Sequence, residues 1–498
     1  MLKHFSIAAS AGLIALSSAA SATAHPLPTH LHRAPTLAEI RYARSVWQPV
    51  AAAAPFGNNG AGTAVLMTDG TVLIHDNFSA WYRLTPDIDG SYISGTWSQA
   101  ASLPSGYGPL YYADAVLPDG RLIIEGGEYN FDRQVETTLG AIYDPVANTW
   151  TAVSPPTGWN AIGDAQSAVL SDGTMMLGNC CSRVQALLDE STLTWTITGT
   201  GKADDNSEEG WSLLPDGNIL TADVLNSNPK QSELYTASTG VWSNAGSTVA
   251  ELADYIEIGP QILLPDGKVL ATGASGNTAL YDTRNGKWKA GPTFPTQNGK
   301  QLDIADGPGS LLPNGHALLV ASPGAYAAPS SFFEFNGKGL IALPGTPNSA
   351  QDSSYDFRML PLPNGQVLVT DGSNDVEIYT NGGSPKAAWA PVITSVPTTL
   401  THGSTYALEG TYLNGFSQAG AYGDDAQAAT NYPLVRITIN ATGHVFYART
   451  HDFSAMPVAS PAAVTTNFDV PASIETGAAT LQAVANGIPS APVAVTLQ

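Results

Sequence analysis

The sequence predicts an all-β protein built from seven repeats, and three observations lead to that prediction. Gly and Pro are frequent, at 49 and 35 of 498 residues, as the many turns of a β protein require. One phrase recurs seven times: an apolar run, a Pro/Ser/Thr-Asp/Asn-Gly turn, and a second apolar run. The turns lie about fifty residues apart. Their glycines are Gly70, Gly120, Gly173, Gly217, Gly267, Gly315 and Gly365.

Each copy of the phrase reads as two strands joined by a tight hairpin, because Asp-Gly and Asn-Gly favour such turns. Repeats of roughly fifty residues made of short strands are typical of the blades of a kelch-type β-propeller. Seven blades close a ring around a central channel. We therefore expect a seven-bladed propeller over residues 47–390.

The two ends of the chain lie outside the repeats. Residues 1–24 have the pattern of a signal peptide, with Lys3, an apolar stretch over 5–16 and Ala-Thr-Ala at 22–24. Residues 25–46 form a leader, and the short strand-like runs of 391–498 predict an immunoglobulin-like β-sandwich. We expect a secreted or periplasmic monomer.

The charge of the chain limits its partners. The net charge is −22, with only 20 Lys and Arg, so the basic stripe that nucleic acids require is missing. Anionic membranes are disfavoured for the same reason, and after the signal no stretch is apolar for long enough to span a bilayer. A neutral or cationic small molecule or glycan is the expected partner. The alternative is that the acidity only keeps the protein soluble.

One position in the repeat is unusually acidic. The residue nine before each turn glycine should lie near the start of an innermost strand, facing the channel. These residues are Ala61, Tyr111, Asp164, Glu208, Ile258, Asp306 and Asp356. Four are carboxylates, and Glu257 precedes Ile258. A ring of carboxylates would bind a cation, or the repulsion between the carboxylates would raise some of their pKa values. Alternatively, the acids bond backbone amides and hold neighbouring blades together.

Two further groups of polar residues stand out. Tyr355 and Asp356 are adjacent at the start of the last repeat. In the C-terminal region, residues 431–454 contain His444, Arg449, His451 and Asp452, which are exceptional in a region of otherwise bland composition. We expect this stretch to form a hairpin that reaches the channel and brings His451 to the acidic ring.

The two cysteines of the chain, Cys180 and Cys181, are adjacent. In an oxidising compartment they either stay free or bond to each other. A disulfide between neighbours would form a rigid apolar plate, suited to the apolar face of a sugar.

With these residues assembled, the chain resembles the galactose oxidase and glyoxal oxidase family over nearly all of residues 25–498. The resemblance implies a kelch-type propeller followed by an early-set immunoglobulin-like domain, with a C-terminal hairpin that supplies a copper-binding histidine. The family's THxxN-like segment is similar to Thr450-His451-Asp452-Phe453-Ser454, which makes His451 that ligand. Tyr355 matches the axial tyrosine, and Asp356 stands where the family has a histidine.

The residues of the family's tyrosine–cysteine radical are replaced. Asp164 stands at the tyrosine position, and Tyr111-Tyr112 at the cysteine position. A crosslinked radical is therefore not expected. The cofactor is unknown; one divalent ion (Ca, Mn, Zn or Cu) is compatible with the carboxylates and imidazole.

These observations favour a carbohydrate-directed enzyme that uses metal-assisted or acid/base chemistry in an axial pocket. The expected catalytic residues are Tyr355, Asp356, His451 and Asp164, and the first three would also hold a metal. The expected substrate-binding residues are Tyr111, Glu208, Asp306, Cys180, Cys181 and Arg449. The alternatives are a copper-dependent alcohol or aldehyde oxidase with a modified site, and a non-catalytic glycan-binding module.

Overall fold

A computed structural model describes residues 46–423 and 427–498, so the predicted signal (1–24) and nearly all of the leader (25–46) lie outside the described residues. The described part is all-β. Its helical segments are two single turns, η1 (Ser354–Asp356) and η2 (Ala387–Trp389). Across residues 46–423 and 427–498, neither helical turn approaches the length and apolar character of a membrane-spanning helix.

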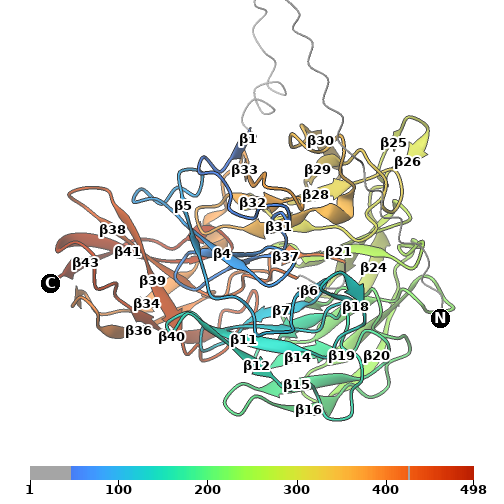
Figure 1. Cartoon of the computed structure of the whole chain (residues 1–498), viewed down its shortest axis with the longest axis horizontal. Coiled ribbons are helices and arrows are strands. Elements are labelled where there is room, and N and C mark those ends of the chain that lie inside the picture. Colours follow the sequence, from blue (N-terminus) through green and yellow to red (C-terminus); the bar gives the residue numbers. More distant parts are fainter. Residues whose placement is uncertain (1–45, 424–426) are drawn as a thin grey trace, which may run out of the picture.

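Most described strands fall into seven antiparallel sheets with four strands paired in a row (Figure 1). The first sheet holds β2 (Ala64–Leu66), β3 (Val72–His75), β4 (Trp81–Thr85) and β5 (Thr96–Gln99), and the second holds β7 (Ala113–Val116), β8 (Leu122–Glu125), β11 (Gly140–Asp144) and β12 (Thr149–Val153). The third holds β13 (Ser167–Val169), β14 (Met175–Gly178), β15 (Gln185–Asp189) and β16 (Thr194–Thr198). The fourth holds β17 (Ser212–Leu213), β18 (Ile219–Ala222), β19 (Gln231–Thr236) and β20 (Val241–Ser247).

The other three sheets follow in chain order. They are β21 (Ile258–Leu263), β22 (Lys268–Gly273), β23 (Thr278–Asp282) and β24 (Lys287–Ala290); β27 (Gly309–Leu311), β28 (Ala317–Ala321), β29 (Ser331–Phe335) and β30 (Leu340–Leu343); and β31 (Arg358–Pro361), β32 (Val367–Thr370) and β33 (Glu377–Thr380) with β1 (Val46–Pro49). Short strands in the connecting loops are β6 (Pro109–Leu110), β9 (Tyr129–Asn130), β10 (Arg133–Gln134), β25 (Thr296–Gln297) and β26 (Lys300–Gln301).

The sheets form a β-propeller. Each sheet places the strand that leads into its turn glycine innermost, and these inner strands contact one another, as β7 does with β13 and β27 does with β21 and β31. The ring is closed where β2 contacts β31 and where β1, from the start of the chain, pairs with β33 as the outer strand of the last sheet. Sequence patterns did not reveal β1, because a four-residue strand has no hairpin signal of its own.

The predicted hairpin turns are confirmed. All seven turn glycines have φ between 76 and 93°, a range that side-chain-bearing residues rarely adopt. In the first turn the Asp69 carboxylate accepts a hydrogen bond from the backbone N–H of Thr71 at 3.0 Å, which fixes the loop.

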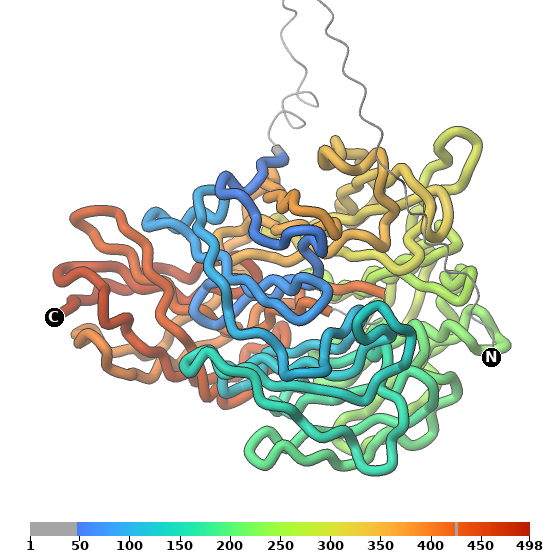
Figure 2. Tube along the Cα trace, in the orientation of Figure 1, coloured from blue at the N-terminus to red at the C-terminus, as the bar shows by residue number. Residues whose placement is uncertain are grey.

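The C-terminal region forms a separate nine-stranded sheet. Its order is β34 (Val392–Ser395), β36 (Thr405–Thr411), β40 (Ala463–Asp469), β39 (Val445–His451), β38 (Leu434–Ile439), β41 (Gly477–Ala485), β43 (Val493–Leu497) and β35 (Thr399–Leu400), with β42 (Ile488–Pro489) paired to β41. The tube trace shows this region in red, to one side of the ring (Figure 2).

The C-terminal sheet lies against the turn end of the first propeller sheets. The backbone N–H of Thr450 donates to Thr68 O at 3.2 Å, and that of Phe453 donates to Pro118 O at 3.0 Å. Because each inner strand runs toward its turn, the strand starts lie at the opposite end of the ring. The predicted carboxylates are therefore on the end away from this sheet.

A segment of the C-terminal region enters the ring, but it is not the predicted one. Its described residues, 414–423 and 427–432, precede β38, and its strand β37 (Gly420–Ala421) pairs with β27. The Gln418 side chain accepts a hydrogen bond from Leu213 N at 2.7 Å, and Tyr422 Oη donates to Tyr355 O at 2.7 Å. This segment thus joins the inner strands to the loop that precedes β31.

Candidate functional site

Three carboxylates converge at the starts of adjacent inner strands. Ligand oxygens of Glu208, Glu257 and Asp306 all lie within 4.8 Å of one another. We call these residues the inner acidic cluster. Glu208 and Glu257 are buried, whereas Asp306 is partly exposed. The cluster is therefore open to solvent on the Asp306 side, and it concentrates negative charge that a cation would relieve.

The backbone is left-handed at three of the seven shared repeat positions. Tyr111, Glu208 and Asp306 have φ of 55°, 60° and 53°. Such values are uncommon for residues with a side chain and cost about 1–3 kcal/mol where the surroundings impose them. Two of the three acids of the inner acidic cluster, Glu208 and Asp306, therefore have strained backbones.

Two tyrosines border the inner acidic cluster. Tyr326 Oη donates to Glu257 Oε1 at 2.8 Å, and the Tyr326 ring packs edge-on against Tyr355 with centroids 5.0 Å apart. Tyr326 is 61% exposed, so its ring presents a face to solvent beside the carboxylates. Desolvation and the charges of Glu257 and Asp306 raise the pKa of Tyr326. Burial and Asp356 raise the pKa of Tyr355 to about 12, so both phenols are protonated donors at neutral pH.

One arginine, Arg358, contacts tyrosines from three parts of the chain: the loop before β31, the start of the second sheet, and the segment that enters the ring. Arg358 Nη1 donates to Tyr355 O at 2.8 Å, and its guanidinium carbon lies 4.0 Å from the Tyr422 ring centroid and 5.5 Å from that of Tyr111. Asp356 caps η1 by accepting a hydrogen bond from Ser353 N at 2.8 Å. Burial raises the pKa of the Asp356 carboxyl. Arg358 thus holds Tyr111 and Tyr355 in one contiguous group of residues.

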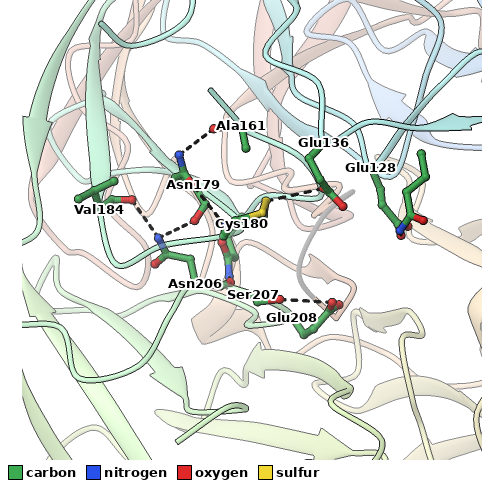
Figure 3. Close-up of a disulfide and its surroundings, with 12 residues drawn as sticks. Glu128, Glu136, Ala161, Asn179, Cys180, Val184, Asn206, Ser207 and Glu208 are labelled. Carbon is green, nitrogen blue, oxygen red and sulfur yellow. Dashed lines mark hydrogen bonds between the residues drawn. A yellow bond between two sulfur atoms is a disulfide. The ribbon is translucent and has the colours of Figure 1, made fainter. Parts of the chain in front are cut away.

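Cys180 and Cys181 are joined in a vicinal disulfide (Figure 3). Of the two alternatives left open by the sequence, the structure has the bonded one. Cys180 is buried, with Sγ 3.7 Å from Glu136 Oε2, and Cys181 is exposed. Asp164 is buried at the start of the third sheet, directly after Gly163, which packs against Cys180.

His451 does not join the acidic residues, and the expectation that its hairpin enters the channel is wrong. His451 Nδ1 lies 2.8 Å from Asp452 Oδ2, and Nε2 lies 3.2 Å from Asp469 Oδ1, within the C-terminal sheet. Arg449 is nearby, with Nε 3.2 Å from Asp469 Oδ2. The reason is strand pairing: β39 is bonded to β38 along its first half and to β40 along its second, so its backbone cannot extend into the ring.

His444 is also outside the ring, paired with Glu475. The predicted metal ligands His451, Asp356 and Tyr355 are therefore not one site. Within the described ranges, the groups of three close ligand residues include neither His451 nor Asp356.

The copper-radical site of the resembling family does not fit these residues. Tyr111 and Tyr112 stand where its cysteine would be, and the two cysteines of the chain are bonded to each other. His451 lies at the other end of the inner strands. These residues therefore do not form a copper-radical site.

A second carboxylate cluster includes Glu209, the residue that follows Glu208 in sequence. Glu209, Asp223 and Glu233 also have ligand oxygens within 4.8 Å of one another, and all are buried. Lys202 Nζ lies 2.8 Å from Glu209 and 3.0 Å from Glu233. We call these four residues the Lys202 cluster. Burial alone lowers the pKa of Lys202, but Glu209 and Glu233 outweigh it and raise that pKa; the lysine is therefore charged and fills this site.

Three of the site's residues were not identified from sequence. Tyr326 lies in the loop after β28 and Tyr422 in the inserted segment, and neither occupies the repeated position that singled out the acids. Arg358 is two residues after Asp356, and its only sequence signal was that adjacency.

No family model matches the chain. Among curated proteins it is similar to Kelch-like protein terF of Aspergillus terreus, at 27% identity over 126 residues, which are 25% of this chain and 26% of that protein. The chain thus matches about a quarter of that relative's length, and this likeness supports a kelch-type fold.

Among solved structures the chain is similar to a fungal alcohol oxidase of the AA5 family in complex with copper. Their TM-score is 0.42 at 16% identity, covering 88% of this chain and 85% of that one. It is also similar to virginiamycin B lyase from Staphylococcus aureus, with a TM-score of 0.47 at 10% identity, covering 68% and 99% of the two chains. Both TM-scores are low, so the architecture rests on the strand pairing given above.

Proposed function

We propose that the protein is a secreted, galactose-oxidase-like enzyme directed at carbohydrate, which works without a tyrosine–cysteine copper radical. Its framework would be a seven-bladed propeller (47–390) followed by an immunoglobulin-like domain (391–498). The observation that carries the proposal is the inner acidic cluster, bordered by the exposed ring of Tyr326.

The cluster suits a divalent cation. Three carboxylates with oxygens within 4.8 Å of one another repel when ionised, and an oxygen-binding cation such as Ca²⁺ or Mn²⁺ relieves that repulsion. When bound, the cation would polarise a hydroxyl or carbonyl oxygen of the substrate. Glu208, Glu257 and Asp306 would hold it.

The surrounding residues suit a sugar. The Tyr326 ring offers an apolar face for sugar C–H groups, and the phenols of Tyr326 and Tyr355 are protonated donors. The net charge of −22 favours a neutral or amino sugar over an acidic one. Without a cation, the same carboxylates would act as acid and base on a glycosidic bond.

The test is a screen of neutral, amino and acidic glycans with protein exported in its native way, with product detected by mass spectrometry. We expect a product from a neutral or amino glycan, suppressed by chelator and abolished in Glu257→Gln. Asp205→Asn is the matched control, because Asp205 is an exposed acid on the Glu208 segment that pairs only with Arg183 in the structure's described ion pairs. Retention on glycan without product would identify a binding module instead, and peroxide with bound copper would identify an oxidase.

A further inference from the structure

The disulfide-closed turn at residues 179–182 lies between two loops that lead to predicted site residues (Figure 3). On one side, Cys180 N donates to Ile162 O at 3.0 Å, and Asn179 Nδ2 donates to Ala161 O at 2.7 Å. That loop continues directly into Gly163 and Asp164. The disulfide turn is therefore attached to the segment that begins the third sheet.

On the other side, the turn is attached to Asn206, two residues before Glu208. Asn206 is completely buried, and its backbone N–H donates to Ser182 O at 2.9 Å. Its side-chain amide donates to Asn179 O at 3.0 Å and to Val184 O at 2.9 Å. Asn179 and Ser182, the two ends of the disulfide turn, therefore both accept hydrogen bonds from Asn206. Figure 3 shows the bonds of the Asn206 side chain.

Glu208 is held from its other side by the Lys202 cluster. The next residue, Glu209, is buried and bound to Lys202 at 2.8 Å. Glu208 thus lies between Glu209, which is held by Lys202, and Asn206, which the disulfide turn helps to hold. The side chains of Gln166 and Gln185 also donate hydrogen bonds to Asn206. Ser207, between Asn206 and Glu208, donates its hydroxyl to Glu208 Oε1 at 3.4 Å. A left-handed residue such as Glu208, with φ of 60°, relaxes when its surroundings no longer impose that conformation.

We propose that the Cys180–Cys181 disulfide is a positioning element that helps to hold Glu208 within the inner acidic cluster, so that its reduction weakens cation binding. This inference rests on the proposed cation site. Cys181 is exposed, so a small dithiol can reach it. The dithiol's two electrons and two protons break the S–S bond and give two cysteine thiols, and the dithiol becomes a cyclic disulfide.

The experiment uses the full chain and Tb³⁺ alone as the probe, since Tb³⁺ prefers oxygen ligands as Ca²⁺ does and its luminescence is excited through nearby tyrosines. Affinity and the number of waters on bound Tb³⁺ are measured before and after dithiothreitol treatment. Because the chain has only these two cysteines, dithiothreitol changes a single bond. Cys180→Ser/Cys181→Ser is the matched control and must not respond to dithiothreitol.

We expect reduction to weaken Tb³⁺ binding about 10–100-fold, as loss of a supporting contact around a metal ligand does, and to leave more water on the ion. Glu208→Gln should show the same weakened binding, with no further loss on reduction, whereas Asp306→Asn should still respond. Circular dichroism on the reduced protein checks that the ring stays folded.

Three results would overturn the account, each in a different way. Unchanged Tb³⁺ affinity after verified reduction refutes the positioning role while leaving the cation site intact. Wild-type affinity in both Glu208→Gln and Glu257→Gln refutes the proposed cation site itself. An equal response to reduction in Glu208→Gln and wild type also contradicts a role that acts through Glu208.

Discussion

Glu208 and Glu209 are neighbours in sequence but belong to two different carboxylate clusters. Both clusters bring three acids within 4.8 Å. In the Lys202 cluster the acids are fully buried and a lysine lies between two of them. In the inner acidic cluster one acid is partly exposed, and the polar neighbour described for Glu257 is the neutral hydroxyl of Tyr326. In the first cluster a lysine of the protein already compensates part of the acids' charge, whereas the second is suited to a cation from solution.

The largest expected effect concerns the Lys202 cluster. Lys202→Met leaves Glu209 and Glu233 buried without their cation, so the free energy of unfolding should fall by about 3–5 kcal/mol. Guanidinium denaturation measures this loss. Glu208→Gln, one residue from Glu209, is the control and should leave that free energy nearly unchanged; equal losses in both variants would remove the distinction between the clusters.

Glu257→Gln should instead affect cation affinity and not the stability of the fold. It removes one of three like charges, so stability should be unchanged or slightly raised, while affinity for Mn²⁺ or Ca²⁺ should fall at least about tenfold, or about 1.4 kcal/mol. Calorimetric titration and thermal melts separate the two effects. A large drop in melting temperature with unchanged affinity would make the inner acidic cluster a structural element.

The pH dependence of stability should sharpen the comparison further. Burial and Glu233 raise the pKa of Asp223 in the Lys202 cluster to about 7. A carboxyl whose pKa is raised on folding contributes stability that is complete below about pH 4 and is lost as pH rises to about 7. Burial also raises the pKa of other carboxyls to about 7, namely those of Glu190, Asp303, Asp352 and Glu377.

The melting temperature of the protein should therefore fall between pH 4 and pH 7 and then level off. Asp223→Asn should make this fall shallower, which thermal melts across the range would show. A wild-type melting temperature that rises from pH 4 to pH 7 would contradict the raised pKa values.

The smallest effect is expected for Tyr326→Phe. This change removes the hydroxyl that donates to Glu257 at 2.8 Å but keeps the exposed ring. Cation affinity should change by about 0.5–1.5 kcal/mol, the net worth of one hydrogen bond, and glycan retention should persist. Tyr326→Ala should lose that retention; if it does not, the ring is not a sugar platform.

The repeat period predicted that Glu208 and Asp306 lie close together. Glu208 and Asp306 occupy the same position in different repeats, so the ring brings them together, and Glu257 is displaced from that position by one residue. The same one-residue step separates Glu208 from Glu209 and sends their side chains to different clusters. Sequence alone could not assign each acid to its cluster, since Lys202 lies in the loop between β16 and β17, outside the recurring hairpin phrase.

The C-terminal contribution could not be predicted in the same way. The resemblance pointed to His451, but β39 is hydrogen-bonded on both sides and remains in its sheet. The segment that does enter the ring, described for residues 414–423 and 427–432, is rich in small residues, and these residues include no histidine or cysteine. Its entry depends on long-range contacts such as those of Gln418 and Tyr422, which leave no local pattern.

The most direct test of the inner acidic cluster is the metal content of natively exported protein, measured by inductively coupled plasma mass spectrometry on wild type, Glu257→Gln and Asp205→Asn. The account predicts one calcium, manganese or zinc per chain in wild type and Asp205→Asn, and loss of that metal in Glu257→Gln. Stoichiometric copper, or a metal that Glu257→Gln retains in full, would contradict it.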